Sequence, residues 1–335
     1  MVDRREPADP PGASLRELIA TARAFAIPMT TRFRGITVRE GALISGPAGW
    51  GEFSPFAEYG PRECARWLAC AVEAAVSGWP QPRRDRIGVN VTVPAVTPER
   101  AHAMAAGSGC RTAKVKVAEP GAAESEDIAR VEAVRDALGP DGRIRVDANG
   151  AWDTGTAVRM LRILARFGLE YAEQPCATLA ELAEVRRRVD VPIAADESIR
   201  RAEDPLAVRA AGAADYVVIK VQPLGGVRAA LAVTEACGLP AVVSSAVETS
   251  VGLAAGIALA AALPGLDHDC GLATMSLLRG DVTADPLAAE GGFVPVRAAI
   301  PDRAALERWE TDPAPWRARM TRAARFLAGA AVVPA

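Results

Sequence analysis

The chain has 335 residues, of which 50% are hydrophobic and 24% are charged, with a formal net charge of −2 and a pI near 5.9. This length can form one large core or a large and a small domain, and the near-neutral charge excludes the basic surface that nucleic acid or an anionic membrane would require. The most apolar stretch, 251–263, is too short to cross a bilayer and predicts a buried helix, so we expect no membrane insertion and a small-molecule partner.

The N-terminus and the cysteines indicate a cytoplasmic protein. Residues 1–12, MVDRREPADPPG, are charged and proline-rich, which predicts a flexible tail and not a signal peptide. The six cysteines contain no CxxC pair, which favours reduced thiols over disulfides or a zinc site. The sequence does not specify an oligomeric state.

Residues 13–84 predict a small α+β domain. GITVREGALISG and GWGEFSPF are typical of antiparallel strands with glycine turns, and RECARWLACAVEAAVSGW is an amphipathic helix that ends at a glycine. We expect this domain to cap a larger one, with its loops within 25–36 and 50–59 closing over the site.

Residues 85–280 alternate short β-branched runs with Ala/Arg/Glu stretches of helical period, which predicts βα units. Strand ends recur mostly every 23 to 26 residues, as a closed barrel requires. An open doubly wound sheet is the alternative, but no GxGxxG follows the first strand. The expected strands are 87–92, 112–117, 144–147, 169–173, 192–196, 216–221, 241–245 and 266–269. Residues 281–335 are expected to return to the capping domain.

Lysine is rare in this chain. Only Lys114, Lys116 and Lys220 are lysines, so 36 of the 39 basic residues are arginine. Lysine can lose its proton when its pKa is lowered whereas arginine cannot, so these positions indicate places where an amine is chemically required. The alternative is that they are solvated surface residues, but their neighbours in TAKVKV and YVVIKV are apolar.

The predicted strand ends carry a regular series of acids. Asp147, Glu173 and Asp196 end three consecutive strands, with a lysine on the strand to either side. Adjacent buried carboxylates repel one another, and a hard divalent cation with oxygen ligands would neutralise them, which favours Mg²⁺, with Mn²⁺ as a substitute. The alternative is that the acids form only salt bridges with the lysines. Asn149 and Glu197 lie next to this series and are expected to support it.

A metal flanked by two amines suits removal of a proton next to a carboxylate. The metal would stabilise the enediolate as its charge develops, while a lysine with a lowered pKa takes the proton. The second lysine would face the first across the barrel mouth, as a cation or as a second acid/base group.

The motifs KVKV, VDANGAW, AEQP, ADES and VIKVQPLGG, in this order, resemble the muconate-lactonising branch of the enolase superfamily. The resemblance covers nearly the whole chain and implies an α+β capping domain with a modified (β/α)₈ TIM-type barrel, written (β/α)₇β. It also implies Asp147, Glu173 and Asp196 as Mg²⁺ ligands. Lys116 would be the base, with Lys114 tuning its pKa and Lys220 opposite.

Within that branch, GEFSPFAEY and SSAVETSVGLAAG resemble the actinobacterial dehydratases that form o-succinylbenzoate from 2-succinyl-6-hydroxy-2,4-cyclohexadiene-1-carboxylate in menaquinone synthesis. Lys116 would then remove the α-proton and assist the loss of hydroxide from the same face, while Lys220 stays cationic. Ser244 and Ser245 are candidates for contacting the succinyl arm, although a serine pair at a strand end often only caps a helix.

Two other functions fit the same residues. Racemisation of an N-acylamino acid or epimerisation of a dipeptide would use both lysines as acid/base partners. A barrel that binds a small acid without turning it over would need neither lysine.

A few weaker signals complete the prediction. Asp267 and Asp269 could hold a substrate ammonium group or cap a turn, and Arg32 and Arg34 are candidate partners for a substrate carboxylate. His102 is expected to be structural, and neither His102 nor His268 lies directly after the seventh strand, which disfavours the mandelate-type branch.

Overall fold

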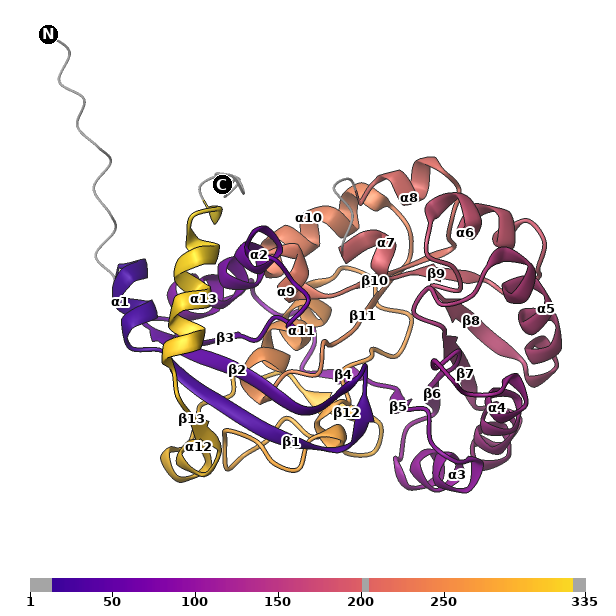
Figure 1. The fold of residues 1–335 in the computed structure, drawn as a ribbon, viewed down its shortest axis with the longest axis horizontal. Helices are drawn as coiled ribbons and strands as arrows, with labels where there is room; N and C mark the ends of the chain where they lie inside the picture. The colour runs from indigo at the N-terminus through magenta and orange to yellow at the C-terminus, as the bar shows by residue number, and fades with distance from the viewer. Residues whose placement is uncertain (1–13, 201–204, 328–335) are drawn as a thin grey trace, which may run out of the picture.

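The computed structural model describes residues 14–200 and 205–327, so the predicted tail at 1–12 lies outside the described residues. Figure 1 shows two parts of the molecule. One is an antiparallel sheet packed against helices, at the left of the view, and the other is a curled parallel sheet surrounded by helices, at the right. The predicted α/β class, with a capping domain beside a modified barrel, is confirmed.

The capping domain is built on a sheet with the order β13-β1-β2-β3. Arg34 and Gly35 have φ values of 49° and 79°, so the first hairpin turns within two residues of left-handed backbone. Helix α2 packs its apolar face on β3, and α13 packs on α2. Its elements are α1 (Leu15–Ala20), β1 (Arg23–Phe33), β2 (Ile36–Gly46), β3 (Gly49–Phe53), α2 (Pro61–Val72), a π-helical turn η1 (Glu73–Ser77), β13 (Glu310–Thr311) and α13 (Ala314–Ala324).

The barrel is a seven-stranded parallel sheet in the order β11-β10-β9-β8-β7-β6-β5. Most residues of its strands are buried, because helices cover the outer face of the sheet and side chains fill the interior. The strands are β5 (Val91–Val93), β6 (Thr112–Lys116), β7 (Arg143–Asp147), β8 (Leu169–Glu173), β9 (Ile193–Ala195), β10 (Tyr216–Ile219) and β11 (Ala241–Val243).

The connecting helices run back along the outside of the sheet (Figure 1). All thirteen residues of the last of them, α11, are buried, as predicted for this apolar stretch. In the part of the chain that the structure describes, no helix combines the length and apolarity needed to reach across a bilayer. The helices are α3 (Pro98–Gly107), α4 (Glu124–Leu138), α5 (Thr154–Leu164), η2 (Ala165–Phe167), α6 (Leu179–Arg186), α7 (Glu197–Arg200), α8 (Ala207–Ala210), α9 (Val221–Leu224), α10 (Val227–Cys237) and α11 (Ser250–Ala262).

The barrel closes at a different place from the one predicted. Residues 266–269 form no strand, and the gap between β11 and β5 is bridged instead by Cys270 and Gly271, which pair with Val89 and Ser244. Two of the residues at 266–269 are acids that suit the barrel end and not its wall, whereas the apolar Cys270 and Gly271 can lie between two strands. The predicted eighth strand is therefore wrong in position.

The predicted first strand is divided into two. β4 (Arg86–Gly88) pairs antiparallel with β12 (Phe293–Pro295), and only β5 joins the barrel sheet. The segment after the barrel also contains the 3₁₀ turn η3 (Met275–Leu277) and α12 (Arg303–Trp309), and then reaches β13, which pairs with β1.

Candidate active site

The carboxyl ends of neighbouring barrel strands bring six charged side chains together. The sheet register aligns Lys116 with Asp147 and Asp147 with Glu173, and the remaining residues follow on the next strands. All six are buried. They are Lys114, Lys116, Asp147, Glu173, Asp196 and Lys220. The structure thus gathers the lysines and acids that the sequence predicts at this face of the barrel.

Ammonium groups and carboxylates alternate through this cluster. Lys114 Nζ lies 3.1 Å from Asp147 Oδ2 and 2.9 Å from Glu173 Oε1. Lys116 Nζ donates to the same Asp147 oxygen, and Lys220 Nζ lies 2.5 Å from Asp196 Oδ2. Each carboxylate therefore has an ammonium partner in this arrangement.

Asn149 links Lys116 to the neighbouring acids. Its Oδ1 accepts a hydrogen bond from Lys116 Nζ at 2.7 Å, and its Nδ2 donates to Glu197 Oε1 at 3.2 Å. Its backbone N–H donates to Asp147 Oδ1 at 3.0 Å, with φ at 48°. The side chain therefore fixes where the Lys116 amine lies.

The pKa of Lys114 is shifted in the opposite direction from the pKa values of Lys116 and Lys220. Burial lowers the pKa of Lys116, helped by the positive charge of Lys114, and outweighs the attraction of Asp147. Burial likewise lowers the pKa of Lys220. For Lys114, burial is outweighed by Glu173 and Asp147, and its pKa is raised. Lys116 and Lys220 are therefore the amines that release a proton most readily, while Lys114 remains a fixed cation.

The pKa values of the three acids are also shifted in different directions. Burial, followed by the negative charge of Asp147, raises the pKa of Glu173 to about 7. Burial is outweighed at Asp147 by its two lysines and at Asp196 by Arg200 and Lys220, so both of these pKa values are lowered. The acid in the middle of the series is the one least compensated by positive charge.

Comparison with known proteins places this chain in a family. Residues 24–75 match the enolase N-terminal domain-like family and residues 97–302 match the enolase C-terminal domain-like family. The chain is 70% identical over 303 residues to the o-succinylbenzoate synthase of Thermobifida fusca, covering 90% of this chain and 96% of that protein. It is 54% identical to that of Mycobacterium tuberculosis, covering 89% and 91%. The chain belongs to the o-succinylbenzoate synthase family of the enolase superfamily. The predicted family is confirmed.

Solved structures share the fold at lower identity. The muconate lactonizing enzyme of Pseudomonas fluorescens superposes with a TM-score of 0.76 at 23% identity, covering 87% of this chain and 98% of that one. The N-succinyl Arg/Lys racemase of Bacillus cereus gives 0.75 at 20%, covering 87% and 97%. These likenesses support the superfamily fold.

Enzymes of the o-succinylbenzoate synthase family generally depend on a divalent metal, and the donor set in this chain fits one. Three buried carboxylates on adjacent strands supply hard oxygen ligands. Beside them, the buried Oε2 of Glu197 has no hydrogen-bond partner within residues 14–200 and 205–327. As the described side chains stand, no three acids, histidines or cysteines form a ready metal site. Lysine ammonium groups lie against the oxygens that a metal would take.

Sequence reasoning missed Arg200, which ends α7. Its Nε donates to Asp196 Oδ1 at 3.0 Å, its Nη2 donates to Glu197 Oε1, and its Nη1 donates to Tyr59 Oη at 2.5 Å. The side chain is buried. Its position four residues after Asp196 on a helix is the signal that could have indicated this contact.

The capping domain covers the barrel mouth with its first hairpin. Phe33 and Arg34 line a small cavity that also includes Lys116 and Lys220. The Phe33 ring centroid lies 5.4 Å from Lys116 Nζ. Arg34 stacks on Phe56, with its Cζ 4.6 Å from the ring centroid. Arg32 is exposed and does not line this cavity, so of the two arginines only Arg34 is placed for a ligand.

The two serines after β11 have different surroundings. Ser245 Oγ lies 2.7 Å from Thr274 Oγ1 and accepts a hydrogen bond from the Val247 N–H at 2.8 Å. Ser244 lines the same cavity, and no described residue hydrogen-bonds to its hydroxyl. Ser244 is therefore the serine whose hydroxyl is available to a ligand.

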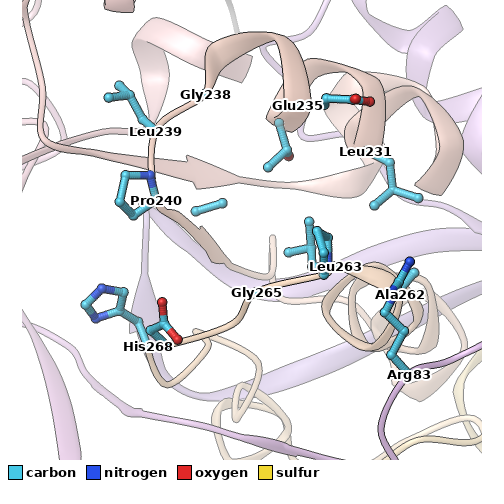
Figure 2. Close-up of a pocket in the computed structure, with 14 residues that line it drawn as sticks. Arg83, Leu231, Glu235, Gly238, Leu239, Pro240, Ala262, Leu263, Gly265 and His268 are labelled. Atoms are coloured by element: carbon cyan, nitrogen blue, oxygen red, sulfur yellow. The ribbon is translucent and has the colours of Figure 1, made fainter.

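The remaining candidates lie away from the mouth. Thr112, the first residue of β6, donates to Asp269 Oδ2 at 2.5 Å, and His268 Nδ1 lies 3.0 Å from Glu170 Oε1, near the start of β8. Asp267 and His268 line a separate pocket of about 580 Å³, and Figure 2 labels His268 at this pocket. The suggested ammonium site is therefore wrong, because these acids lie at the amino ends of the strands. His102 lies on α3, 3.2 Å from Asp136.

Proposed function

We propose that this chain catalyses the Mg²⁺-dependent loss of water from 2-succinyl-6-hydroxy-2,4-cyclohexadiene-1-carboxylate to give o-succinylbenzoate, in menaquinone biosynthesis. The observation that carries the proposal is the pair of buried lysines with lowered pKa on either side of three carboxylates, in a chain 70% identical to a synthase of this name. The six cysteines are all buried and none forms a disulfide within the described residues, which supports a reducing compartment and a place in the cytoplasm.

Lys116 has the role of base and then acid. Its neutral amine takes the proton from C1 of the ring, and the electrons of that C–H bond move into the carboxylate to give an enediolate. When the enediolate collapses, the C6–O bond breaks, and the Lys116 ammonium returns its proton to the departing hydroxide as water. The ring becomes aromatic, and Lys116 is ready for another cycle. Both steps occur on one face of the ring, which defines a syn elimination.

Lys220 stabilises negative charge from the other side of the carboxylate cluster. Although burial lowers its pKa, its ammonium is paired with Asp196, and in this proposal it stays protonated through the cycle and lowers the energy of the enediolate, as preorganised positive charge does in a buried site. Burial and, after it, the positive charge of Lys114 keep the pKa of Lys116 low, and Asn149 orients the Lys116 amine.

Asp147, Glu173 and Asp196 would hold the metal, with Glu197 beside them. Oxygen ligands alone favour Mg²⁺, and Mn²⁺ would substitute. When bound, the metal would supply positive charge next to the substrate carboxylate and acidify the proton at C1. The raised pKa of Glu173, caused by burial and by Asp147, is the electrostatic sign that this cluster accommodates further positive charge.

The substrate carboxylates have separate partners in this proposal. The ring carboxylate lies at the metal and the lysines, and the succinyl arm extends under the capping hairpin towards Arg34 and Ser244. Arg34 is held by Phe56 and by Glu58, whose Oε1 lies 4.0 Å from its Nη2.

The test is to mix the enzyme and Mg²⁺ with the cyclohexadiene carboxylate and follow its ultraviolet absorbance. Rapid loss of the diene signal that requires Mg²⁺ and disappears in Lys116→Ala supports the dehydratase. An unchanged signal overturns it. Incorporation of deuterium at the α-carbon of N-succinyl amino acids or dipeptides would then indicate a racemase or epimerase. Binding of the acid that survives loss of both lysines, without turnover, would indicate a binding protein.

A further inference from the structure

Glu52, the fourth residue of β3, reaches out of the capping domain to the N-terminus of α11. Its Oε2 accepts hydrogen bonds from the Thr249 N–H at 3.1 Å, from Thr249 Oγ1 at 2.5 Å and from the Gly252 N–H at 3.1 Å. Its Oε1 accepts one from Ser54 Oγ at 2.6 Å. A carboxylate at this position satisfies backbone donors that a helix leaves unpaired.

Glycine at position 252 makes this approach feasible. A Cβ added there would lie 2.8 Å from the Glu52 carboxylate and 2.7 Å from Glu248 Cβ. Alanine would therefore push the carboxylate away from the helix end without altering its charge.

Arg39, on β2, contacts the other side of the same loop. Its Nε donates to the Val247 carbonyl at 2.8 Å, and its Nη2 donates to the Ser54 carbonyl at 2.6 Å. Arg39 and Glu52 are 2% and 3% exposed, so neither contact is shared with bulk water. Two capping strands thus contribute one buried cation and one buried anion to a single loop of the barrel.

The contacted loop lines the mouth of the barrel. Ser244, Ser245, Ala246 and Val247 all border the cavity that contains the lysines. Val247 has a φ of 63°, which is unfavourable for a β-branched residue and persists only when the surroundings enforce it. The Arg39 contact to the Val247 carbonyl and the Glu52 contacts to Thr249 lie on either side of this strained position.

A second capping-domain acid provides a comparison. Glu73 accepts hydrogen bonds from the Val227 and Arg228 N–H groups, at 2.5 and 3.2 Å, at the N-terminus of α10. It makes the same kind of cap between the domains, but none of these residues lines the cavity at the barrel mouth. Substitutions at Glu73 and Glu52 can therefore distinguish an effect on docking of the domains from an effect on the loop that borders the cavity.

We infer that Glu52 and Arg39 are positioning residues that hold the 244–249 loop in its strained, substrate-binding form, so that the seated capping domain sets the affinity of the barrel for its substrate. The inference rests on the proposed function for the identity of that substrate. Neither residue touches the reacting atoms.

The first experiment compares Glu52→Gln and Gly252→Ala with Glu73→Gln at pH 8, where the Glu52 carboxylate is ionised, using the Mg²⁺-loaded full chain and the cyclohexadiene carboxylate. The amide in Glu52→Gln replaces charge-assisted bonds by neutral ones, and alanine in Gly252→Ala displaces the carboxylate. Both variants are expected to raise KM about five- to tenfold with kcat changed less than about twofold, which is the loss of roughly one such hydrogen bond. Glu73→Gln is expected to leave KM unchanged. An unchanged KM in Glu52→Gln and Gly252→Ala, or an equal rise in all three variants, would overturn the inference.

Hydrogen exchange gives a readout that does not depend on activity. At pH 8, peptides that cover 244–252 should exchange faster in Glu52→Gln than in wild type, while peptides from α10 do not change. In Glu73→Gln the pattern should be reversed. If the wild type fails to dehydrate the diene, the proposed function fails, and this exchange pattern still decides the role of Glu52. Equal exchange of the loop in wild type and Glu52→Gln would refute that role.

Discussion

Lys116 and Lys220 pair with acids at opposite edges of the carboxylate series, Lys116 with Asp147 at the end of β7 and Lys220 with Asp196 after β9. Burial lowers the pKa of both lysines. The geometry therefore provides two amines, and the proposed elimination uses only one of them for proton transfer. This asymmetry distinguishes dehydration from racemisation, in which both amines must exchange protons.

Arginine substitutions test the asymmetry. Lys116→Arg keeps a positive charge but cannot act as a base, so we expect kcat to fall by about 10³-fold or more. Lys220→Arg keeps the cationic role and should retain at least about tenfold more activity than Lys116→Arg. Steady-state assays of both variants with the cyclohexadiene carboxylate make the comparison. Equal losses would indicate that Lys220 also transfers a proton.

The side chain of Asn149 can be tested without disturbing its backbone. Glycine accepts the φ of 48° and keeps the N–H that donates to Asp147, so Asn149→Gly removes only the contacts to Lys116 and Glu197. We expect kcat to fall about fivefold, because the Lys116 amine loses a hydrogen bond of about 1 kcal/mol that orients it. The thermal midpoint should move little. An unchanged kcat would show that the Asp147 pair alone orients the amine.

The proposed catalytic cluster could be predicted from the sequence because every member lies at or near the carboxyl end of a short predicted strand. The period of two along β6 directs Lys114 and Lys116 to the same side, and parallel strands open at one face. The eighth strand could not be located in this way, because the closing bridges are formed by Cys270 and Gly271, and two residues carry no periodicity.

Contacts between the domains could not be predicted from the sequence either. Glu52 and Thr249 are 197 residues apart, and no local pattern indicates that GWGEF and VETSVG meet. Arg200 was hidden for a different reason. The chain has 36 arginines, most of which are expected to be solvated. The sequence alone does not distinguish Arg200 from them, because its contact with Asp196 depends on the short helix α7.

Arg200 is expected to control metal affinity. It donates to Asp196 and Glu197 and is itself anchored by Tyr59, so it fixes the orientation of one proposed ligand and its neighbour. Arg200→Lys cannot make all three contacts, and we expect the Mg²⁺ concentration for half-maximal activity to rise about 10- to 100-fold. The activity at saturating Mg²⁺ should recover largely.

The matched control is Arg186→Lys, a surface residue that pairs with Asp215 at 2.7 Å and should leave the Mg²⁺ titration unchanged. Direct calorimetric titration of Mg²⁺ gives the same comparison without substrate. If Arg200→Lys binds Mg²⁺ as tightly as the wild type, Arg200 does not orient the site.

Glu52 should also make stability depend on pH. Burial raises its pKa to about 7, against the attraction of Arg39, from about 4.5 in the unfolded chain. The charged and titratable groups that face it are Arg39 from β2, Glu248 from the 244–249 loop and Cys70 from α2. The folded state therefore binds more protons than the unfolded state between these two pKa values. The contribution of Glu52 to the free energy of unfolding is full below pH 4.5 and is lost as the pH rises through about 7.

Glutamine at position 52 removes this dependence. From pH 5 to pH 8, the free energy of unfolding of Glu52→Gln minus that of wild type should increase by about 2–3 kcal/mol. Urea denaturation at pH 5, 6, 7 and 8 measures the difference, and parallel curves for the two proteins would contradict it. At pH 8 the variant should be globally more stable while its 244–252 amides exchange faster. The two effects have one cause, because the ionised carboxylate that accepts hydrogen bonds from Thr249 and Gly252 is also the charge that folding must bury.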